Sequence, residues 1–200
     1  MKDLPKFKYL LNPIESGVFE TDKTVKCDCC GKETSLYYCG PIYGDFDEDP
    51  KLCPNCIKEG KANQWYMETF EDESGLTFFD GDYEDVNDEA KIKELLHCTP
   101  AHFTWQSFTW PAHCDDFCQF ISFVYTKKEG YLNMPRYSDV STKGYMTMQE
   151  LKEAGIWDKV APEDFDDVES REEFMEMDHA LFYLYKCLYC DTYRLLWDCS

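Results

Sequence analysis

Two cysteine-rich stretches, Cys27-Asp28-Cys29-Cys30-Gly31 and Cys53-Pro54-Asn55-Cys56, decide the fold of the N-terminal part of the chain. Each contains a pair of cysteines separated by two residues, Cys27 and Cys30 or Cys53 and Cys56, beside a glycine or proline that favours the tight turn needed for two thiolates to meet at one ion. Two such pairs are typical of a tetrahedral zinc site with four sulfur ligands. The predicted zinc ligands of this first site are Cys27, Cys30, Cys53 and Cys56.

The segments around these pairs predict how the ligands are presented. Residues 35–41 are expected to form a strand and a turn, and residues 54–66 a short helix that begins at the second pair. Two ligands on a turn and two at a helix start would resemble a treble-clef zinc module. Cys29 is then an extra thiol, and the alternative is that all these cysteines are small buried apolar residues.

The remaining pattern predicts an α+β fold, with this cysteine-rich, zinc-knuckle module packed on a body of helices and a hairpin. Of the 200 residues 44% are hydrophobic, which is ample for a packed core. We divide the chain into an N-terminal arm and zinc module, 1–66, and a body, 67–200, which together would also make one compact domain. The first 25 residues are expected to form an extended arm docked on the core. Expected helices cover about 88–97, 147–154 and 169–179, and expected strands 120–125, 180–186 and 193–197.

A second cysteine cluster is expected to join two distant parts of the body. Cys187 and Cys190 form another turn between two predicted strands, and Pro111 is expected to open a short helix in which residues four apart share one face. The predicted ligands of this second zinc site are Cys114, Cys118, Cys187 and Cys190, with His113 as a rival ligand. The alternatives are buried structural residues, an open catalytic zinc site, or a reactive thiol at Cys114 beside His113 and Asp116.

The net charge of −20 is concentrated in residues 71–94 and 150–178, which carry −8 and −9. Such acidity argues against direct binding of nucleic acid and favours a basic protein partner. The alternatives are solvated surfaces that keep the protein soluble, or a mimic of DNA. No apolar leader follows Met1, and no stretch approaches the roughly 18 apolar residues of a membrane helix. We therefore expect a cytoplasmic protein with reduced thiols and no membrane contact.

Catalytic motifs are weak in this sequence. It contains no glycine-rich phosphate loop, no G-x-S-x-G elbow and no H-E-x-x-H. Trp105, Phe108 and Trp110 are expected in the core, although they would also suit a pocket beside His113. We expect no enzyme activity, with a metal- or thiol-dependent site around His113 and Cys114 as the alternative.

Several motifs together resemble the CbrC family of bacterial proteins, in order and spacing and over essentially the whole chain. They are Leu4-Pro5-Lys6-Phe7-Lys8-Tyr9, Asn12-Pro13, Cys27-Asp28-Cys29-Cys30-Gly31-Lys32, Leu52-Cys53-Pro54-Asn55-Cys56-Ile57, Trp110 with His113-Cys114-Asp115-Asp116-Phe117-Cys118, and Cys187-Leu188-Tyr189-Cys190. The resemblance implies tolerance to a nuclease-type colicin. It also supports treating His113, Cys114 and Cys118 as one unit with Cys187 and Cys190. It supplies no catalytic residues. Asp191 stands where the more usual pattern has glycine, which affects the tightness of that turn. The expected function is therefore stress or toxin tolerance through an acidic surface that binds a basic protein.

Overall fold

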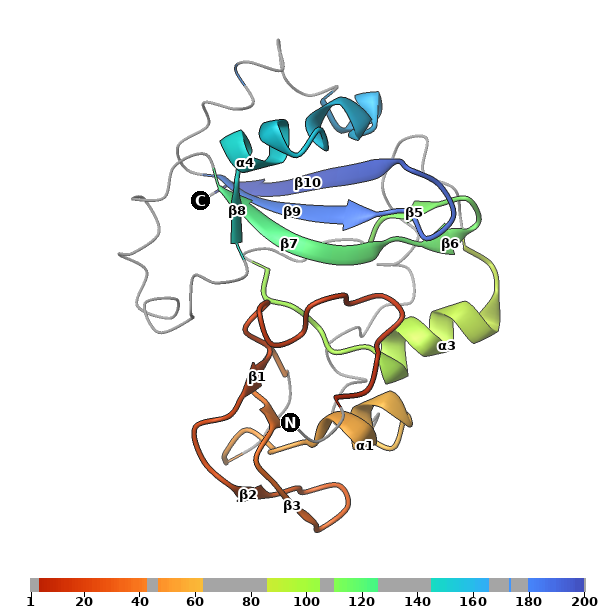
Figure 1. The fold of residues 1–200 in the computed structure, drawn as a ribbon. Coiled ribbons are helices and arrows are strands. Elements are labelled where there is room, and N and C mark those ends of the chain that lie inside the picture. The colour runs from red at the N-terminus through yellow and green to blue at the C-terminus, as the bar shows by residue number, and fades with distance from the viewer. Residues whose placement is uncertain are drawn as a thin grey trace.

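The computed structural model describes residues 4–42, 47–62, 86–104, 110–125, 145–165, 173 and 180–199. Its N-terminal part is built from short hairpins and one helix, and the rest from a four-stranded sheet with helices (Figure 1). The strands are β1 (Phe19–Glu20), β2 (Val25–Lys26), β3 (Glu33–Thr34), β4 (Tyr37–Tyr38), β5 (Ala112–His113), β6 (Asp116–Phe117), β7 (Gln119–Tyr125), β8 (Tyr145–Thr147), β9 (Ala180–Lys186) and β10 (Tyr193–Cys199). The helices are α1 (Pro54–Lys58), α3 (Glu89–Cys98) and α4 (Met148–Glu153), with 3-10 turns η4 (Trp157–Lys159) and η5 (Pro162–Phe165). The mixed α+β content is as predicted.

The main sheet has the order β10-β9-β7-β8. Strands β9 and β10 form an antiparallel hairpin that begins with Lys186 opposite Tyr193, and β7 pairs antiparallel with β9. Strand β8 adds to β7 in parallel. The predicted strands at 120–125, 180–186 and 193–197 are therefore confirmed, and the β9–β10 turn carries the last cysteine pair.

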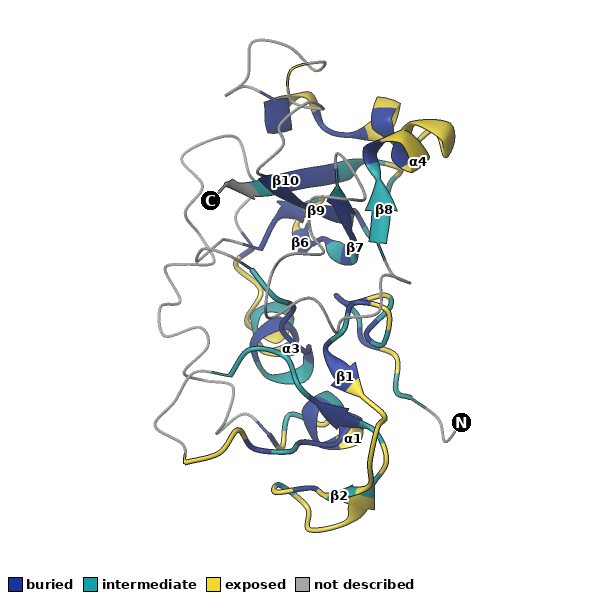
Figure 2. Cartoon of the chain, turned by 90° about the vertical axis from the view of Figure 1, so that its left-hand side faces the viewer, coloured by how far each residue is buried: buried dark blue, intermediate teal, exposed yellow. Residues whose placement is uncertain are grey.

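Both faces of this sheet are covered, which explains why β9 is apolar along its length. Tyr183 and Tyr185 of β9 face a core cluster shared with the N-terminal arm and α1 and α3, whereas Phe182 and Leu184 face a second cluster under α4. Successive strand residues point to opposite faces, so a strand buried on both sides reads as a continuous apolar run. Figure 2 shows the buried sheet beneath the exposed outer surface of α4. Among the described residues, no helix has both the length and the apolar character needed to cross a membrane.

The N-terminal arm lies against β7, as predicted. The Phe120 amide donates to the Tyr9 carbonyl (2.8 Å), and the Leu11 amide donates to the Phe120 carbonyl (3.0 Å). Tyr9 and Leu10 are buried in the same cluster as side chains from both halves of the chain. The division at residue 66 stays a prediction.

Helices α3 and α4 lie where the sequence predicted them, with small shifts at their ends. Asp88 caps α3, because the Asp88 carboxylate accepts from the Ala90 amide (2.9 Å). Thr147 and Glu150 form a reciprocal capping box at the start of α4. Helix α1 ends at Lys58, earlier than expected, and the end of that prediction (63–66) lies outside the described residues. The helix expected over 169–179 also lies outside them, apart from residue 173, which is helical.

The helix expected from Pro111 to Cys118 is wrong, because this segment is the β5–β6 hairpin. His113 pairs with Asp116, so the turn contains only Cys114 and Asp115. Both turn residues have positive φ, 56° and 59°. Two consecutive left-handed residues are the signature of a type I′ turn, whose twist matches that of the strands it joins.

Candidate metal centres

The first ligand pair, Cys27 and Cys30, lies on the turn of the β2–β3 hairpin. The Gly31 amide donates to the Cys27 carbonyl (2.7 Å), and the Cys27 amide donates to the Lys32 carbonyl (2.9 Å). Gly31 has a φ of +71°, a conformation that residues with a Cβ rarely adopt. The glycine thus permits the tight turn that orients both sulfur atoms to the same side.

The second pair, Cys53 and Cys56, lies at the start of α1. Cys53 is the residue that precedes the helix, and Pro54 occupies its first turn, where a missing amide proton costs nothing. The Cys53 amide donates to the Cys27 sulfur (3.3 Å), which ties the helix start to the hairpin turn.

The four sulfur atoms fit one tetrahedral ion. Cys27 Sγ lies 3.9 Å from Cys56 Sγ, Cys30 Sγ lies 3.9 Å from Cys53 Sγ, and all four atoms lie within 4.8 Å of one another. Zinc–sulfur bonds of about 2.3 Å in a tetrahedron place the sulfur atoms about 3.8 Å apart. The structure therefore brings together the four residues predicted from the sequence. It leaves out Cys29, whose thiol donates to the Lys61 carbonyl (3.4 Å).

The thiols of this site differ in acidity. A hydrogen bond from the Lys32 backbone lowers the pKa of the Cys30 thiol to about 7. Burial instead raises the pKa of Cys53 and of Cys56 above the ordinary value of a thiol. Zinc binds thiolates, so binding an ion here must release protons from the buried thiols.

A second group of ligand atoms forms where the β5–β6 turn meets the β9–β10 turn (Figure 1). Cys114 Sγ lies 4.0 Å from Cys190 Sγ, and His113 Nδ1 lies 3.2 Å from Cys114 Sγ and 3.5 Å from Cys190 Sγ. Cys187 completes the group, in which all four ligand atoms lie within 4.8 Å. These spacings also suit a tetrahedral ion, here with three sulfur atoms and one nitrogen.

Cys118 is not brought to this group, in contrast to the prediction. Its side chain is fully buried in the core, and burial raises the pKa of its thiol. Its carbonyl accepts from Trp110 Nε1 (2.7 Å). In a hairpin, Cys118 lies beyond β6 and faces the core, whereas His113 and Cys114 lie at the turn. His113, the rival ligand, therefore stands where the sequence analysis placed Cys118.

Asp116, which the sequence analysis named only as a neighbour of a reactive thiol at Cys114, is a buried carboxylate whose hydrogen-bond network was not predicted. Asp116 accepts from Lys8 Nζ (2.8 Å), Tyr9 Oη (2.7 Å) and Tyr189 Oη (2.6 Å), and from the Phe117 amide (2.9 Å). Burial raises the pKa of Asp116, but the hydrogen bonds from Lys8 and the two tyrosines outweigh it and hold that pKa below its ordinary value. The side chains that donate to Asp116 lie more than 70 residues away from it in the sequence. A single sequence therefore gives no indication that these residues meet.

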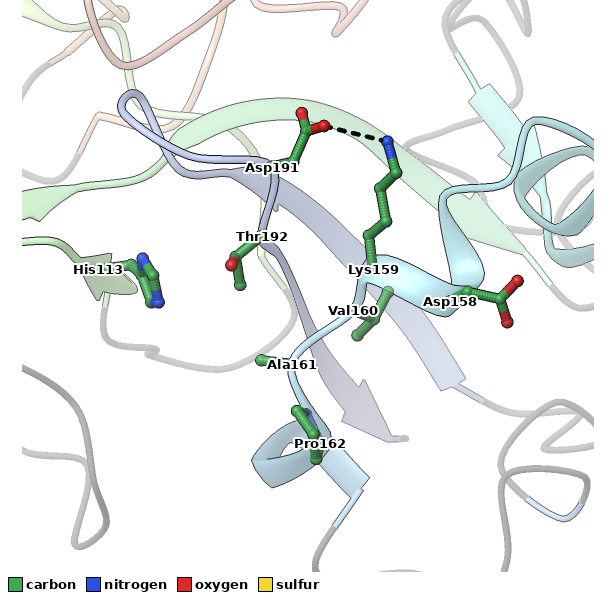
Figure 3. Close-up of a pocket in the computed structure, with 8 residues that line it drawn as sticks. All are labelled: His113, Asp158, Lys159, Val160, Ala161, Pro162, Asp191 and Thr192. Atoms are coloured by element: carbon green, nitrogen blue, oxygen red, sulfur yellow. Dashed lines mark hydrogen bonds and ion pairs between the residues drawn. The ribbon is translucent and has the colours of Figure 1, made fainter.

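An open cavity of about 490 Å³ borders the second group at His113 (Figure 3). Lys159 and Asp191 form an exposed ion pair across it (3.3 Å). Its other lining residues are Asp158, Val160, Ala161, Pro162 and Thr192. Trp110 is buried in the core and does not line this cavity, and Trp105 and Phe108 lie outside the described residues.

Two other histidines, His97 and His102, lie in the described part of the chain. His102 is buried among aromatic rings, and burial lowers its pKa to about 4. His97 is half-buried on α3, where burial also lowers the pKa, and His179 lies outside the described residues. Neither described histidine belongs to a ligand cluster among the described residues.

Comparison with known proteins gives a family match over nearly the whole chain. The model of an uncharacterised protein family, UPF0167, matches residues 4–199. The chain is 35% identical over 119 residues to the UPF0167 protein of Pseudomonas aeruginosa, a match that covers 58% of this chain and 62% of that protein. It is 30% identical over 118 residues to the UPF0167 proteins of Mycobacterium bovis and Mycobacterium tuberculosis, covering 59% of each chain. The chain thus matches about three fifths of the length of these relatives. No solved structure matches it significantly.

Proposed function

We propose that this chain, which belongs to the UPF0167 family, is a zinc-binding interaction protein with two structural metal sites. Site 1 holds a zinc ion with Cys27, Cys30, Cys53 and Cys56, and site 2 holds one with His113, Cys114, Cys187 and Cys190. The observation that carries the proposal is that two separate sets of four soft ligand atoms each fit within 4.8 Å. Sulfur and imidazole ligands in a tetrahedral arrangement favour zinc.

Four protein ligands at each site favour a structural over a catalytic role. A catalytic zinc ion keeps one position for water or substrate, and a closed set of four ligands leaves none. Site 1 takes two ligands from a hairpin turn and two from a helix start. We assign this module to the treble-clef type on that arrangement.

We propose further that the acidic surface binds a basic protein. Exposed carboxylates in the described parts of the two acidic stretches support this: Asp88, Glu89, Glu150, Glu153 and Asp158. Asp164 is an exception, because it is buried in an ion pair with Arg194 and contributes nothing to the surface. The negative charge of these exposed side chains would speed the approach of a basic partner and select against acidic ones.

The biological role we propose is tolerance to a nuclease-type toxin in the cytoplasm. The resemblance to the CbrC family supports the toxin, and the net charge of −20 supports a basic target. The eleven cysteines whose side chains are described form no disulfides, which suits a reducing compartment.

The test of the interaction is a titration of the full chain with a basic nuclease domain of a colicin. We expect binding at low salt that weakens steeply as ionic strength rises, since screening shortens the range of charge attraction. Replacing Glu153 and Asp158 together by Gln and Asn should weaken binding, whereas Glu33→Gln, an exposed acid outside both stretches, should not. Absence of binding at low salt would rule out this partner class and leave the zinc sites standing.

A further inference from the structure

The carboxylate of Asp116 accepts hydrogen bonds from side chains of two distant segments of the chain. Asp116 is only 1% exposed. Lys8 Nζ (2.8 Å) and Tyr9 Oη (2.7 Å) come from the N-terminal arm, and Tyr189 Oη (2.6 Å) comes from the β9–β10 turn. Asp116 itself belongs to β6, so one buried group joins the arm, the β5–β6 hairpin and the last cysteine turn.

The position of this carboxylate relates it to site 2. Asp116 pairs in register with His113, directly across the turn that holds Cys114. Tyr189 lies between Cys187 and Cys190 in the sequence, and its amide donates to the Cys187 sulfur (3.4 Å). The hydrogen bond from Tyr189 to Asp116 therefore connects the hairpin that carries one ligand pair to the turn that carries the other.

The Tyr189 side chain is held mainly by this hydrogen bond to Asp116. The residue is 62% exposed, although its side chain is large and aromatic. Burial of its ring contributes little free energy, so its hydroxyl provides the main specific contact. Hydrogen bonds to a charged acceptor are roughly twice as strong as those between neutral groups.

The arm side of the network is more deeply packed. The Tyr9 ring is fully buried and meets the Phe117 ring edge-on, with the ring centres 5.6 Å apart. The Lys8 ammonium lies 4.7 Å from the centre of the Tyr9 ring while it binds Asp116. The arm thus contacts the Asp116 carboxylate through two neighbouring residues whose side chains also contact each other.

We propose that Asp116 is the positioning residue of site 2, and that it couples zinc binding there to docking of the N-terminal arm. Through Tyr189 it fixes the distance between the two ligand pairs, and through Lys8 and Tyr9 it fixes the arm. Coupling of this kind is reciprocal, so zinc in site 2 must stabilise the docked arm as much as the docked arm favours zinc. The inference rests on the proposed function, because it requires that site 2 binds zinc.

The first test is the zinc affinity of each site in the full chain, measured by competition with a chromophoric chelator. Tyr189→Phe removes only the hydroxyl of an exposed ring, so it leaves the core intact, and Asp116→Asn removes the charge at constant shape. Both should weaken zinc binding at site 2 by about 10-fold, the lower end of the effect of losing an outer-shell partner, because they act on the ligands through the backbone of the two turns. Site 1 serves as the internal control and should not change.

The matched control is Tyr193→Phe, the same chemical change at the far end of the same turn, where Lys186 lies 5.3 Å from the ring centre. It should bind zinc as the wild type does. If Tyr189→Phe retains wild-type affinity at site 2, the positioning role is wrong although the zinc site stands. A wild-type chain that binds zinc only at site 1 would instead overturn the proposed second site itself.

The second test follows the coupling in the other direction. A Cys187→Ser, Cys190→Ser double variant removes two ligands of site 2, and its amide hydrogen exchange is compared with that of the zinc-loaded wild type. The Leu11 and Phe120 amides, which bond the arm to β7, should exchange at least tenfold faster in the variant. Unchanged exchange at both amides would show that the arm docks independently of site 2.

Discussion

The sulfur atoms of Cys114 and Cys190 lie 4.0 Å apart although 76 residues separate them in the sequence. They meet because β7 follows the β5–β6 hairpin directly and pairs with β9, whose end leads into the last cysteine turn. The geometry of site 2 therefore depends on the pairing of β7 with β9. Site 1 differs, because its ligands lie within 30 consecutive residues, Cys27 to Cys56.

The first prediction concerns site 1. Cys27→Ser should reduce zinc by one ion per chain and destabilise the N-terminal module by several kcal/mol, because a structural zinc ion contributes on the order of 10 kcal/mol. Cys39→Ser is the matched control, since the Cys39 thiol only donates to the Gly17 carbonyl (3.2 Å), as a serine hydroxyl also can. Metal analysis and chemical unfolding measure both effects. Equal zinc loss in the two variants would contradict the assignment.

The second prediction separates His113 from Cys118 as the fourth ligand of site 2. His113→Ala should lose the zinc ion of site 2. Cys118→Ala should keep it and lose only about 1 to 2 kcal/mol of stability through a small core cavity. The measurement is zinc content together with the midpoint of urea unfolding. Zinc loss in Cys118→Ala but not in His113→Ala would restore the ligand set expected from the sequence alone.

Local patterns could predict all four ligands of site 1, but for site 2 they gave Cys118 in place of His113, which was named only as a rival ligand. The spacing of Cys27 and Cys30, with Gly31 after them, specifies a turn that does not depend on distant contacts. Pro111, in contrast, is compatible with the first turn of a helix or with the start of a strand, and the turn residues Cys114 and Asp115 lack the glycine typical of a type I′ turn. Tertiary contacts therefore determine that residues 111–118 form a hairpin rather than a helix.

The apolar strands and the capped helices were predictable for a different reason. Residues 180–185 form a continuous apolar run, which is typical of a strand buried on both faces or of a buried helix, and the turn at Cys187 favours the strand. Thr147 and Gly155 mark the two ends of α4 by local chemistry. The Asp116 network could not be predicted, because nothing in one sequence links Lys8 to Tyr189.

The third prediction concerns pH and His102. Its ring stacks on Phe120, with centres 4.1 Å apart, and binds the Tyr185 hydroxyl (2.6 Å), an environment that lowers its pKa from 6.5 to about 4. His102 of the unfolded chain therefore binds a proton as the pH falls below 6.5, whereas His102 of the folded chain stays neutral down to about pH 4.

Stability contributed by the neutral ring is thus complete above pH 6.5 and is lost as the pH falls toward 4. At pH 5 the loss relative to pH 7 should be about 2 kcal/mol. His102→Gln, which does not titrate, should lack this part of the pH dependence. The measurement is urea unfolding of both proteins at pH 7 and pH 5, and identical pH dependence in the two would refute the account.

The fourth prediction concerns the buried ion pair between Arg194 of β10 and Asp164 of η5. The Arg194 guanidinium lies 2.8 Å from the carboxylate, and both side chains are almost completely buried. Arg194→Met should cost about 3 to 5 kcal/mol, because it leaves a buried charge without a partner. Lys159→Met, which breaks the exposed pair with Asp191, should cost at most about 1 kcal/mol.

A double variant tests the reason for that cost. Adding Asp164→Asn to Arg194→Met removes the stranded charge and keeps an acceptor for the Leu195 amide, which donates to Asp164 (2.8 Å). The double variant should therefore be more stable than Arg194→Met alone. If it is less stable, the loss in the single variant comes from packing rather than from an unpaired charge.

The most direct test of the two-site account is the number of zinc ions per chain, measured by native mass spectrometry on protein purified without chelator. The account predicts two zinc ions per chain for the wild type. One ion, or none, would contradict it.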